Sequence, residues 1–473
     1  MDRRPFACLL ATIALALTGC GGGGGGDDVA ATPPSSPLAA GPSPGGTPAP
    51  GSGPTAPAGT GSPTSTGSPI AGTGTGSPSA SGAPAAAPPA IVSGFAPFGP
   101  VTVATSNGPQ APAVARFASG GSVVVWQSFN GPLQMQRVDA GGQAVGTPAT
   151  IAAIGAPSVQ PAVVPLAGGS FVVLWADATS AGATSRVLMR GFDASGTATT
   201  PLAQVSTAVT SLTALDAAAL PDGGFVVAWA GTQLVGGPST VAVQRFDAAL
   251  APAAQAQLNS PVTAQAQRLP RVAVLPDGSY AVAWLQEGGT TALPSFTVNL
   301  QRFTGTGTAL GAERVLAGTS SGVAFPFDIT ALSDGRLALV WQSFGVTQGV
   351  ADLDLQILGA DGSVLAPSTR IAGASGVDVF DPHVASVGTS GFVVTWEQRS
   401  LAGIRQTDAT VFVQRFANDG TPLEAAQSLG THSLQTTTGE ASGQSSLAAG
   451  TDGHFLLVYD RWLAGSFIDL VGR

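Results

Sequence analysis

The sequence contains no lysine, and only two cysteines, two tyrosines and three histidines occur among its 473 residues. All 18 basic residues are therefore arginines. Without lysine, Schiff-base chemistry and the lysine-dependent phosphate-binding loop are excluded. Cys8 and Cys20 both lie within the first 20 residues. The chain after residue 20 therefore has no disulfide, and an exported domain built from it needs another source of stability.

Positive charge and catalytic motifs are also scarce. Without residues 1–19 the chain has 26 acidic residues and 16 arginines, a net charge of 16 − 26 = −10. This balance argues against nucleic-acid binding, which needs a basic surface. His383, His432 and His454 lack metal-ligand spacing. No Gly-x-Ser-x-Gly elbow occurs, and no thiol follows Cys20. We expect no metal, no cofactor and no enzymatic activity.

The first 20 residues, MDRRPFACLLATIALALTGC, predict export. Two arginines precede the apolar run Ala7–Leu17, which is too short for a bilayer span of about 20 apolar residues. Residues 1–19 are therefore interpreted as a signal peptide. The ending LTGC resembles the lipobox of bacterial lipoproteins. That resemblance implies that Cys20 is lipidated with acyl chains such as palmitate. Because Gly21 stands where an Asp would retain such a protein at the inner membrane, it also implies an outer-membrane location, on the periplasmic face or the cell surface.

The segment after Cys20 predicts a tether. Residues 21–90 consist almost entirely of Gly, Pro, Ser, Thr and Ala. Such a composition buries too little apolar surface to offset the entropy of ordering. We therefore expect residues 20–94 to form a lipidated, disordered linker, with a root-mean-square span of roughly 45–50 Å. The linker would hold residues 95–473 away from a membrane.

A unit of about 55 residues recurs seven times after Pro109. Each unit has a turn and then an apolar run that ends in an aromatic residue. These aromatic residues are Trp126, Trp175, Trp229, Trp284, Trp341, Trp396 and Tyr459. Helix signals are weak, whereas short strands recur. We predict an all-β fold, a seven-bladed β-propeller of four-stranded blades over residues 95–473. The alternative is a six-bladed ring with a degenerate extra unit.

The third unit illustrates the expected blade. Strands are predicted at Leu215–Leu220, Phe225–Trp229, Val241–Asp247 and Ala253–Leu258. The last unit ends after its third strand, whereas residues 98–104 resemble the fourth strands of other units. We expect residues 98–104 to complete the last blade and to pair edges that would otherwise be exposed.

Several repeated residues are interpreted as framework. The third strands carry variants of Gln-Arg-Phe-Asp, and Asp-Gly pairs recur at turns. Together these features resemble the DGGFVVxW…QRFDAxG repeats of bacterial secreted and surface proteins, which implies an exported propeller but no particular activity. The Asp-Gly pairs favour hairpin turns over calcium loops, because alternating acidic residues are absent. The repeated arginines are expected to pair within the framework and the aromatic residues to form the core.

One repeated position varies in residue type. Thirteen residues before the anchoring aromatic residues stand Ala113, Ala162, Asp216, Arg271, Asp328, His383 and Ser446. We expect this position to begin the innermost strand, near the mouth of the central channel. We name Asp216, Arg271, Asp328, His383 and the nearby Asp381 the mouth cluster and predict that it binds a ligand. The competing interpretation is ordinary surface ion pairs, which contribute little.

These observations favour a monomeric, non-catalytic lipoprotein that is anchored through Cys20 and binds a protein or glycan partner. A first alternative is a scaffold in outer-membrane assembly, an analogy at the level of the fold only. A second is a glycan lyase or hydrolase that uses the mouth cluster, because paired acids suit glycoside chemistry.

Overall fold

The computed structural model describes residues 98–472 apart from short gaps. Those gaps are 105–108, 129–130, 154–158, 179–183, 207–208, 233–236, 254–255, 258–264, 291–292, 320–324, 345–350, 375, 390, 401–407, 434–444 and 464. The expected signal peptide, the predicted lipidation site Cys20 and the expected linker up to residue 94 lie outside the described residues. No helix in the described part of the chain is long and apolar enough to cross a membrane.

The described strands form seven four-stranded antiparallel sheets, which we number in chain order. Sheet 1 contains β2 (Pro109–Arg116), β3 (Ser122–Ser128), β4 (Leu133–Val138) and β5 (Ala144–Ala152). Sheet 2 contains β6 (Ala162–Pro165), β7 (Phe171–Ala178), β8 (Ser185–Phe192) and β9 (Ala203–Gln204), with the short 3-10 helix η1 (Ala167–Gly169) after β6. Sheet 3 contains β10 (Ser211–Ala219), β11 (Phe225–Thr232), β12 (Ser239–Phe246) and β13 (Ala256–Gln257).

The remaining sheets follow the same order. Sheet 4 contains β14 (Gln267–Val274), β15 (Tyr280–Thr290), β16 (Leu293–Phe303) and β17 (Ala309–Thr319). Sheet 5 contains β18 (Phe327–Ala331), β19 (Leu337–Phe344), β20 (Ala351–Leu358) and β21 (Thr369–Ala372). Sheet 6 contains β22 (Val377–Ser386), β23 (Phe392–Ser400), β24 (Asp408–Phe416) and β25 (Gln427–Ser433). Sheet 7 contains β26 (Ser445–Ala449), β27 (Phe455–Leu463), β28 (Gly465–Gly472) and β1 (Phe98–Ala104).

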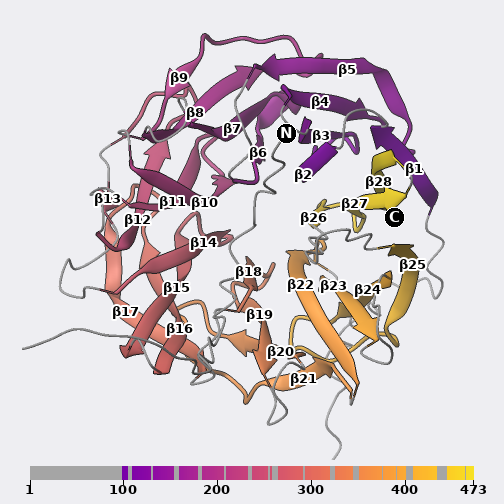
Figure 1. Cartoon of the computed structure of the whole chain (residues 1–473). Coiled ribbons are helices and arrows are strands. Elements are labelled where there is room, and N and C mark those ends of the chain that lie inside the picture. The colour runs from indigo at the N-terminus through magenta and orange to yellow at the C-terminus, as the bar shows by residue number, and fades with distance from the viewer. Residues whose placement is uncertain are drawn as a thin grey trace, which may run out of the picture. The chain divides into compact units, whose positions relative to one another are not determined.

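The first strands of the sheets follow one another in a closed series. Contacts join β2 to β6, β6 to β10, and so on through β26, which in turn contacts β2. Figure 1 shows these strands innermost, with the sheets arranged in chain order around them. The fold is therefore an all-β propeller. Sheet 7 combines both ends of this ring, because β1 pairs antiparallel with β28, with Phe98 opposite Gly472 and Val101 opposite Leu470.

The hydrophobic core lies between neighbouring sheets. Each anchoring aromatic residue is buried in a cluster that also contains residues of the preceding sheet, as Trp229 of β11 does with Val172 and Leu174 of sheet 2. Trp126 likewise packs against Leu456 and Val458 of sheet 7. All seven anchoring aromatic residues are at most 8% exposed. The second strands are buried on both faces, as their continuous apolar sequences predict, and together these contacts confirm the expected core role of the aromatic residues.

The Asp-Gly pairs lie in turns, either between first and second strands (Asp222, Asp277, Asp334, Asp452) or after third strands (Asp361, Asp419). In sheet 3, Gly223 has a φ of 86°, and the Asp222 carboxylate accepts the backbone N–H of Gly224 at 3.0 Å. A side chain at residue 224 would collide with the carbonyl of Phe246. Because the carboxylate is occupied by the turn itself, these pairs are turn residues, as predicted.

Strand bounds differ from the predicted ones in sheet 3. β10 begins at Ser211, four residues before the predicted start at Leu215. Of the predicted fourth strand Ala253–Leu258, Ala256–Gln257 pair with β12, whereas residues 254, 255 and 258 lie outside the described residues. Strand ends depend on hydrogen bonds to neighbouring strands, which the apolar pattern of one segment does not encode.

Candidate functional site

The mouth-cluster position lies on the innermost strands, but the expectation that it begins them is wrong in several sheets. Asp216, Arg271 and His383 lie well inside β10, β14 and β22. The strands extend further because a register irregularity precedes each of these residues. A β-bulge allows a strand to continue with a changed direction and re-aims nearby side chains. In sheets 2, 5 and 7 the expectation holds: Ala162 is the first residue of β6, and Asp328 and Ser446 are the second residues of β18 and β26.

The bulges in sheets 1, 4 and 6 share an unusual backbone. Ala111, Leu269 and Asp381 have φ values of 50°, 50° and 51°, and each precedes a proline. Left-handed backbone is uncommon for residues other than glycine. Because Ala111 and Leu269 adopt it as well, the conformation belongs to the repeat framework and is not specific to the mouth cluster.

Side chains of the mouth position connect neighbouring sheets. The acceptor is a carboxylate or hydroxyl on one sheet, and the donor is a backbone N–H on the next. The three bonds are Val272 N to Asp216 Oδ2 (2.7 Å), Val384 N to Asp328 Oδ2 (3.0 Å) and Val114 N to Ser446 Oγ (3.2 Å). They join sheet 3 to 4, sheet 5 to 6 and sheet 7 to 1. These side-chain oxygens therefore provide acceptors for backbone N–H groups on the innermost strands, whose inner edge pairs with no other strand of the same sheet.

The structure brings the charged residues of the mouth cluster into one chain of contacts. Arg271 Nε lies 3.4 Å from Asp328 Oδ1, and His383 Nδ1 lies 3.6 Å from Asp328 Oδ2. His383 Nε2 lies 3.4 Å from Asp381 Oδ1. Asp381 Oδ2 accepts the N–H and O–H of Ser445 at 2.9 and 2.7 Å. The chain thus alternates in charge across sheets 4 to 6 and ends on sheet 7.

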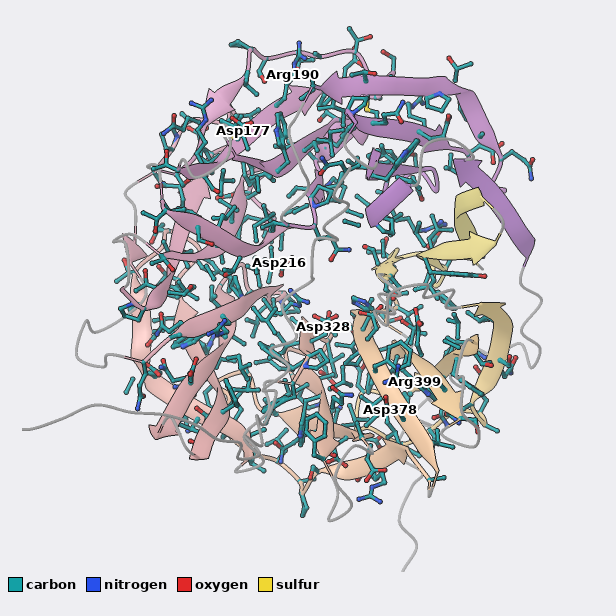
Figure 2. All side chains as sticks on the ribbon, viewed as in Figure 1. Asp177, Arg190, Asp216, Asp328, Asp378 and Arg399 are labelled. Carbon is teal, nitrogen blue, oxygen red and sulfur yellow. The ribbon has the colours of Figure 1, made fainter. Side chains whose placement is uncertain are left out.

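These side chains are shielded but not sealed from solvent. The exposed fractions are 23% for Arg271, 15% for Asp328, 13% for His383 and 25% for Asp381. Figure 2 places Asp216 and Asp328 towards the centre of the ring, whereas Asp177, Arg190, Asp378 and Arg399 lie further out. At these exposures solvent screens the charges of the cluster less than it screens fully exposed pairs.

The pKa values follow from burial and charge. Burial raises the pKa of Asp216 to about 6, although Arg271 opposes the shift. Burial alone would lower the pKa of His383, but Asp381 and Asp328 raise it to about 10. Burial opposes ionisation of Asp381 too, yet His383 and the Ser445 hydrogen bonds hold its pKa below the ordinary value. At neutral pH His383 is therefore a cation, whereas the carboxyl of Asp216 has a pKa of about 6.

Other charged residues have framework contacts. Arg245 pairs with Asp222 and donates to the Gly305 carbonyl at 2.6 Å, and Arg415 pairs with Glu424 at 2.7 Å. Within the described ranges, no group of three or more His, Cys, Asp or Glu side chains has an arrangement suited to a metal. A surface depression lined by Arg302, Arg314, Asp361 and neighbouring residues includes none of the mouth cluster.

Sequence reasoning missed Ser445 and Gln160 at this site. Gln160, two residues before β6, donates to the carbonyls of Pro112 in sheet 1 and Ser445 in sheet 7. The available signal was the proline that directly precedes the mouth position in four units, Pro112, Pro161, Pro270 and Pro382. That repetition marks a fixed backbone conformation beside the site.

Comparisons with known proteins give no family. No family model matches the chain, and no curated protein sequence matches it. Among solved structures, a protein of unknown function from Dyadobacter fermentans is 14% identical with a TM-score of 0.45, covering 68% of this chain and 99% of that one. A PL25 ulvan lyase bound to -[GlcA(1-4)Rha3S]- is 8% identical with a TM-score of 0.47, covering 78% and 95%. The α-L-arabinofuranosidase Arb93A of Fusarium graminearum is 12% identical with a TM-score of 0.45, covering 67% and 98%. With TM-scores below 0.5, these likenesses carry no argument about function.

Proposed function

We propose that the protein is a membrane-tethered, seven-bladed β-propeller that binds an extracytoplasmic glycan or protein partner at the mouth cluster without transforming it. The observation that carries this proposal is the alternating contact chain from Arg271 through Asp328 and His383 to Asp381. Rigid sheets hold these groups, so a ligand meets an array that is already organised. Preorganisation of this kind reduces the entropy lost on binding.

Tethering supports the same proposal. The lipobox-like LTGC would attach Cys20 to the outer membrane, and the linker would let the propeller search for partners around that anchor. Protease treatment of intact cells distinguishes display on the cell surface from a periplasmic location. Degradation of the propeller supports surface display. Complete protection favours a periplasmic role, including the assembly scaffold.

The test is crosslinking and capture of partners from intact cells. Three forms are compared: the unchanged protein, Cys20→Ser, and the double variant Asp216→Asn/Arg271→Gln. We expect a partner that is captured by the unchanged protein and lost from the double variant. A partner retained equally by the double variant would place binding elsewhere on the propeller and would contradict the proposal.

A second candidate is a glycoside hydrolase, and one observation favours it. Asp216 has a pKa of about 6, which suits a general acid near neutral pH. His383, with a pKa of about 10, remains protonated and is unsuited to abstract a proton, so hydrolysis fits better than a lyase reaction. Turnover of a polysaccharide panel tests this candidate. Product formation that disappears in Asp216→Asn would establish it over simple binding.

A further inference from the structure

The members of the mouth cluster differ in how many of their polar atoms are already occupied. Asp328 Oδ1 accepts the Ile329 N–H at 2.9 Å and faces Arg271, and its Oδ2 faces both Val384 N and His383. Both ring nitrogens of His383 face carboxylates, at 3.6 and 3.4 Å, and its Nε2 is buried among the described residues without a hydrogen-bond partner. Both oxygens of Asp381 face His383 or Ser445. These three residues therefore hold one another in place.

Asp216 and Arg271 retain more capacity to form hydrogen bonds with a ligand. Among the described residues, Asp216 receives backbone N–H groups from Val272 and Ala217 but no side-chain donor within hydrogen-bond distance. Arg271 directs Nε toward Asp328 and Nη1 toward the Pro270 carbonyl at 3.3 Å, and in the described part of the chain its Nη2 has no hydrogen-bond partner. The Arg271 side chain is 23% exposed. An acceptor and a donor thus stand on adjacent sheets.

The charge of the cluster limits the class of ligand. Arg271 and His383 are balanced by Asp328 and Asp381, and Asp216 adds at most one further negative charge. The chain without residues 1–19 is also acidic, at −10. A polyanionic glycan would meet no excess of positive charge here. A hydroxyl group both donates and accepts, so neighbouring hydroxyls of a neutral sugar match a carboxylate beside a guanidinium.

Building on the proposed function, we propose that the ligand is a neutral glycan, whose hydroxyl groups are bound by Asp216 and Arg271. In this assignment Asp328, His383 and Asp381 are positioning residues that fix the Arg271 guanidinium. The mature protein then discriminates between glycans by charge as well as by shape.

The experiment measures binding of the purified exported chain to defined polysaccharides by affinity electrophoresis and calorimetry. Dextran, mannan and arabinan serve as neutral probes, and alginate and polygalacturonate serve as acidic ones. The variants are Asp216→Asn, which keeps an oxygen for the Val272 N–H, and Arg271→Gln. The matched control is Asp361→Asn/Arg314→Gln, an exposed Asp–Arg pair at 2.9 Å outside the cluster. Melting curves check that each variant is folded.

We expect at least one neutral polymer to bind, the acidic polymers to fail, and each cluster variant to weaken binding by about tenfold or more. The control pair should bind like the unchanged protein. Binding of an acidic polymer that Arg271→Gln abolishes would overturn the neutral class while supporting the mouth as the binding site. Binding unaffected by either variant, or no binding to any polymer, would overturn this inference, and unaffected binding would also contradict the proposed function.

Discussion

Asp328 occupies the centre of the mouth cluster, between two cations and a backbone donor of the next sheet. Its removal would leave Arg271 without its carboxylate partner and the N–H of Val384 without an acceptor. His383 would also lose one of the two carboxylates that it faces. The loss of one partner of a shielded network usually costs more than the network itself contributes.

We therefore predict that Asp328→Ala destabilises the protein by about 2–4 kcal/mol. Chemical denaturation provides the measurement. The control is Arg314→Ala, which breaks an ion pair whose side chains are 47% and 53% exposed, and its effect should stay within about 0.5 kcal/mol. Equal effects of the two substitutions would show that the cluster is an ordinary surface network.

Asp216 gives the protein a pH dependence of defined sign. Its pKa is raised in the folded state from 3.8 to about 6, so the folded protein favours the protonated form. The contribution of Asp216 to the free energy of unfolding is fully present below about pH 3.8 and is lost as the pH rises through about 6. The difference corresponds to roughly 3 kcal/mol.

The variant Asp216→Asn should remove this loss of stability between about pH 4 and 7. Unfolding free energies measured across that range, for the variant and the unchanged protein, check the prediction. His383 acts over another window: its pKa is raised from 6.5 to about 10, so its stabilising contribution is fully present below about pH 6.5 and is lost as the pH rises to about 10. Parallel pH profiles for the two proteins between pH 4 and 7 would contradict the assignment of Asp216.

At the scale of the element, the outer strands depend on a repeated side chain as well as on backbone pairing. The third strands of sheets 1, 3, 4, 5 and 6 carry a glutamine that donates to a carbonyl of the segment after the strand, as Gln136 does to Val145 at 2.9 Å and Gln244 does to Ala253 at 2.6 Å. The same bond recurs for Gln301, Gln356 and Gln414. This contact explains why glutamine repeats where an apolar residue would also fit the strand pattern.

Strand β1 supplies the fourth strand of sheet 7 and pairs with β28. Deletion of residues 98–104 exposes the edge of β28 and removes the pairing between the two ends of the ring. We predict a sharply lower melting temperature and a greater tendency to aggregate. Calorimetry measures this effect by comparing the chain that lacks residues 98–104 with a control chain that begins at residue 95 and keeps them. An unchanged melting curve for the truncated chain would show that the ring closes without β1.

At the scale of the whole molecule, anchoring and folding should be separable. We predict that Cys20→Ser moves the protein from the membrane fraction to the soluble fraction, because the serine hydroxyl lacks the thiol chemistry of lipidation. The propeller should melt at an unchanged temperature. Cell fractionation with calorimetry gives both results. A Cys20→Ser protein that stays in the membrane fraction would mean that another feature attaches it.

The sequence predicts the repeat architecture well because each unit carries its own turn glycine, apolar strand and anchoring aromatic residue. Those features act locally, so one chain reveals them. The details of the site are harder to predict. That Asp381 contacts both His383 and Ser445 depends on the bulges before the mouth position and on contacts between sheets. The positions of Asp216, Arg271, Asp328 and His383 on consecutive sheets were predictable from the repeat frame, whereas the hydrogen bonds that join the sheets were not.

The most direct test of the account is a hydrogen-exchange footprint of the propeller with its captured partner or with a bound neutral polysaccharide. If the ligand binds at the mouth cluster, hydrogen exchange should slow at the backbone amides of Val272 and Val384, which donate to Asp216 and Asp328. The outer strands β13, β17 and β21 should exchange as in the free protein. Protection confined to the outer strands or to the Asp-Gly turns, with no change on β14 and β22, would contradict binding at the mouth.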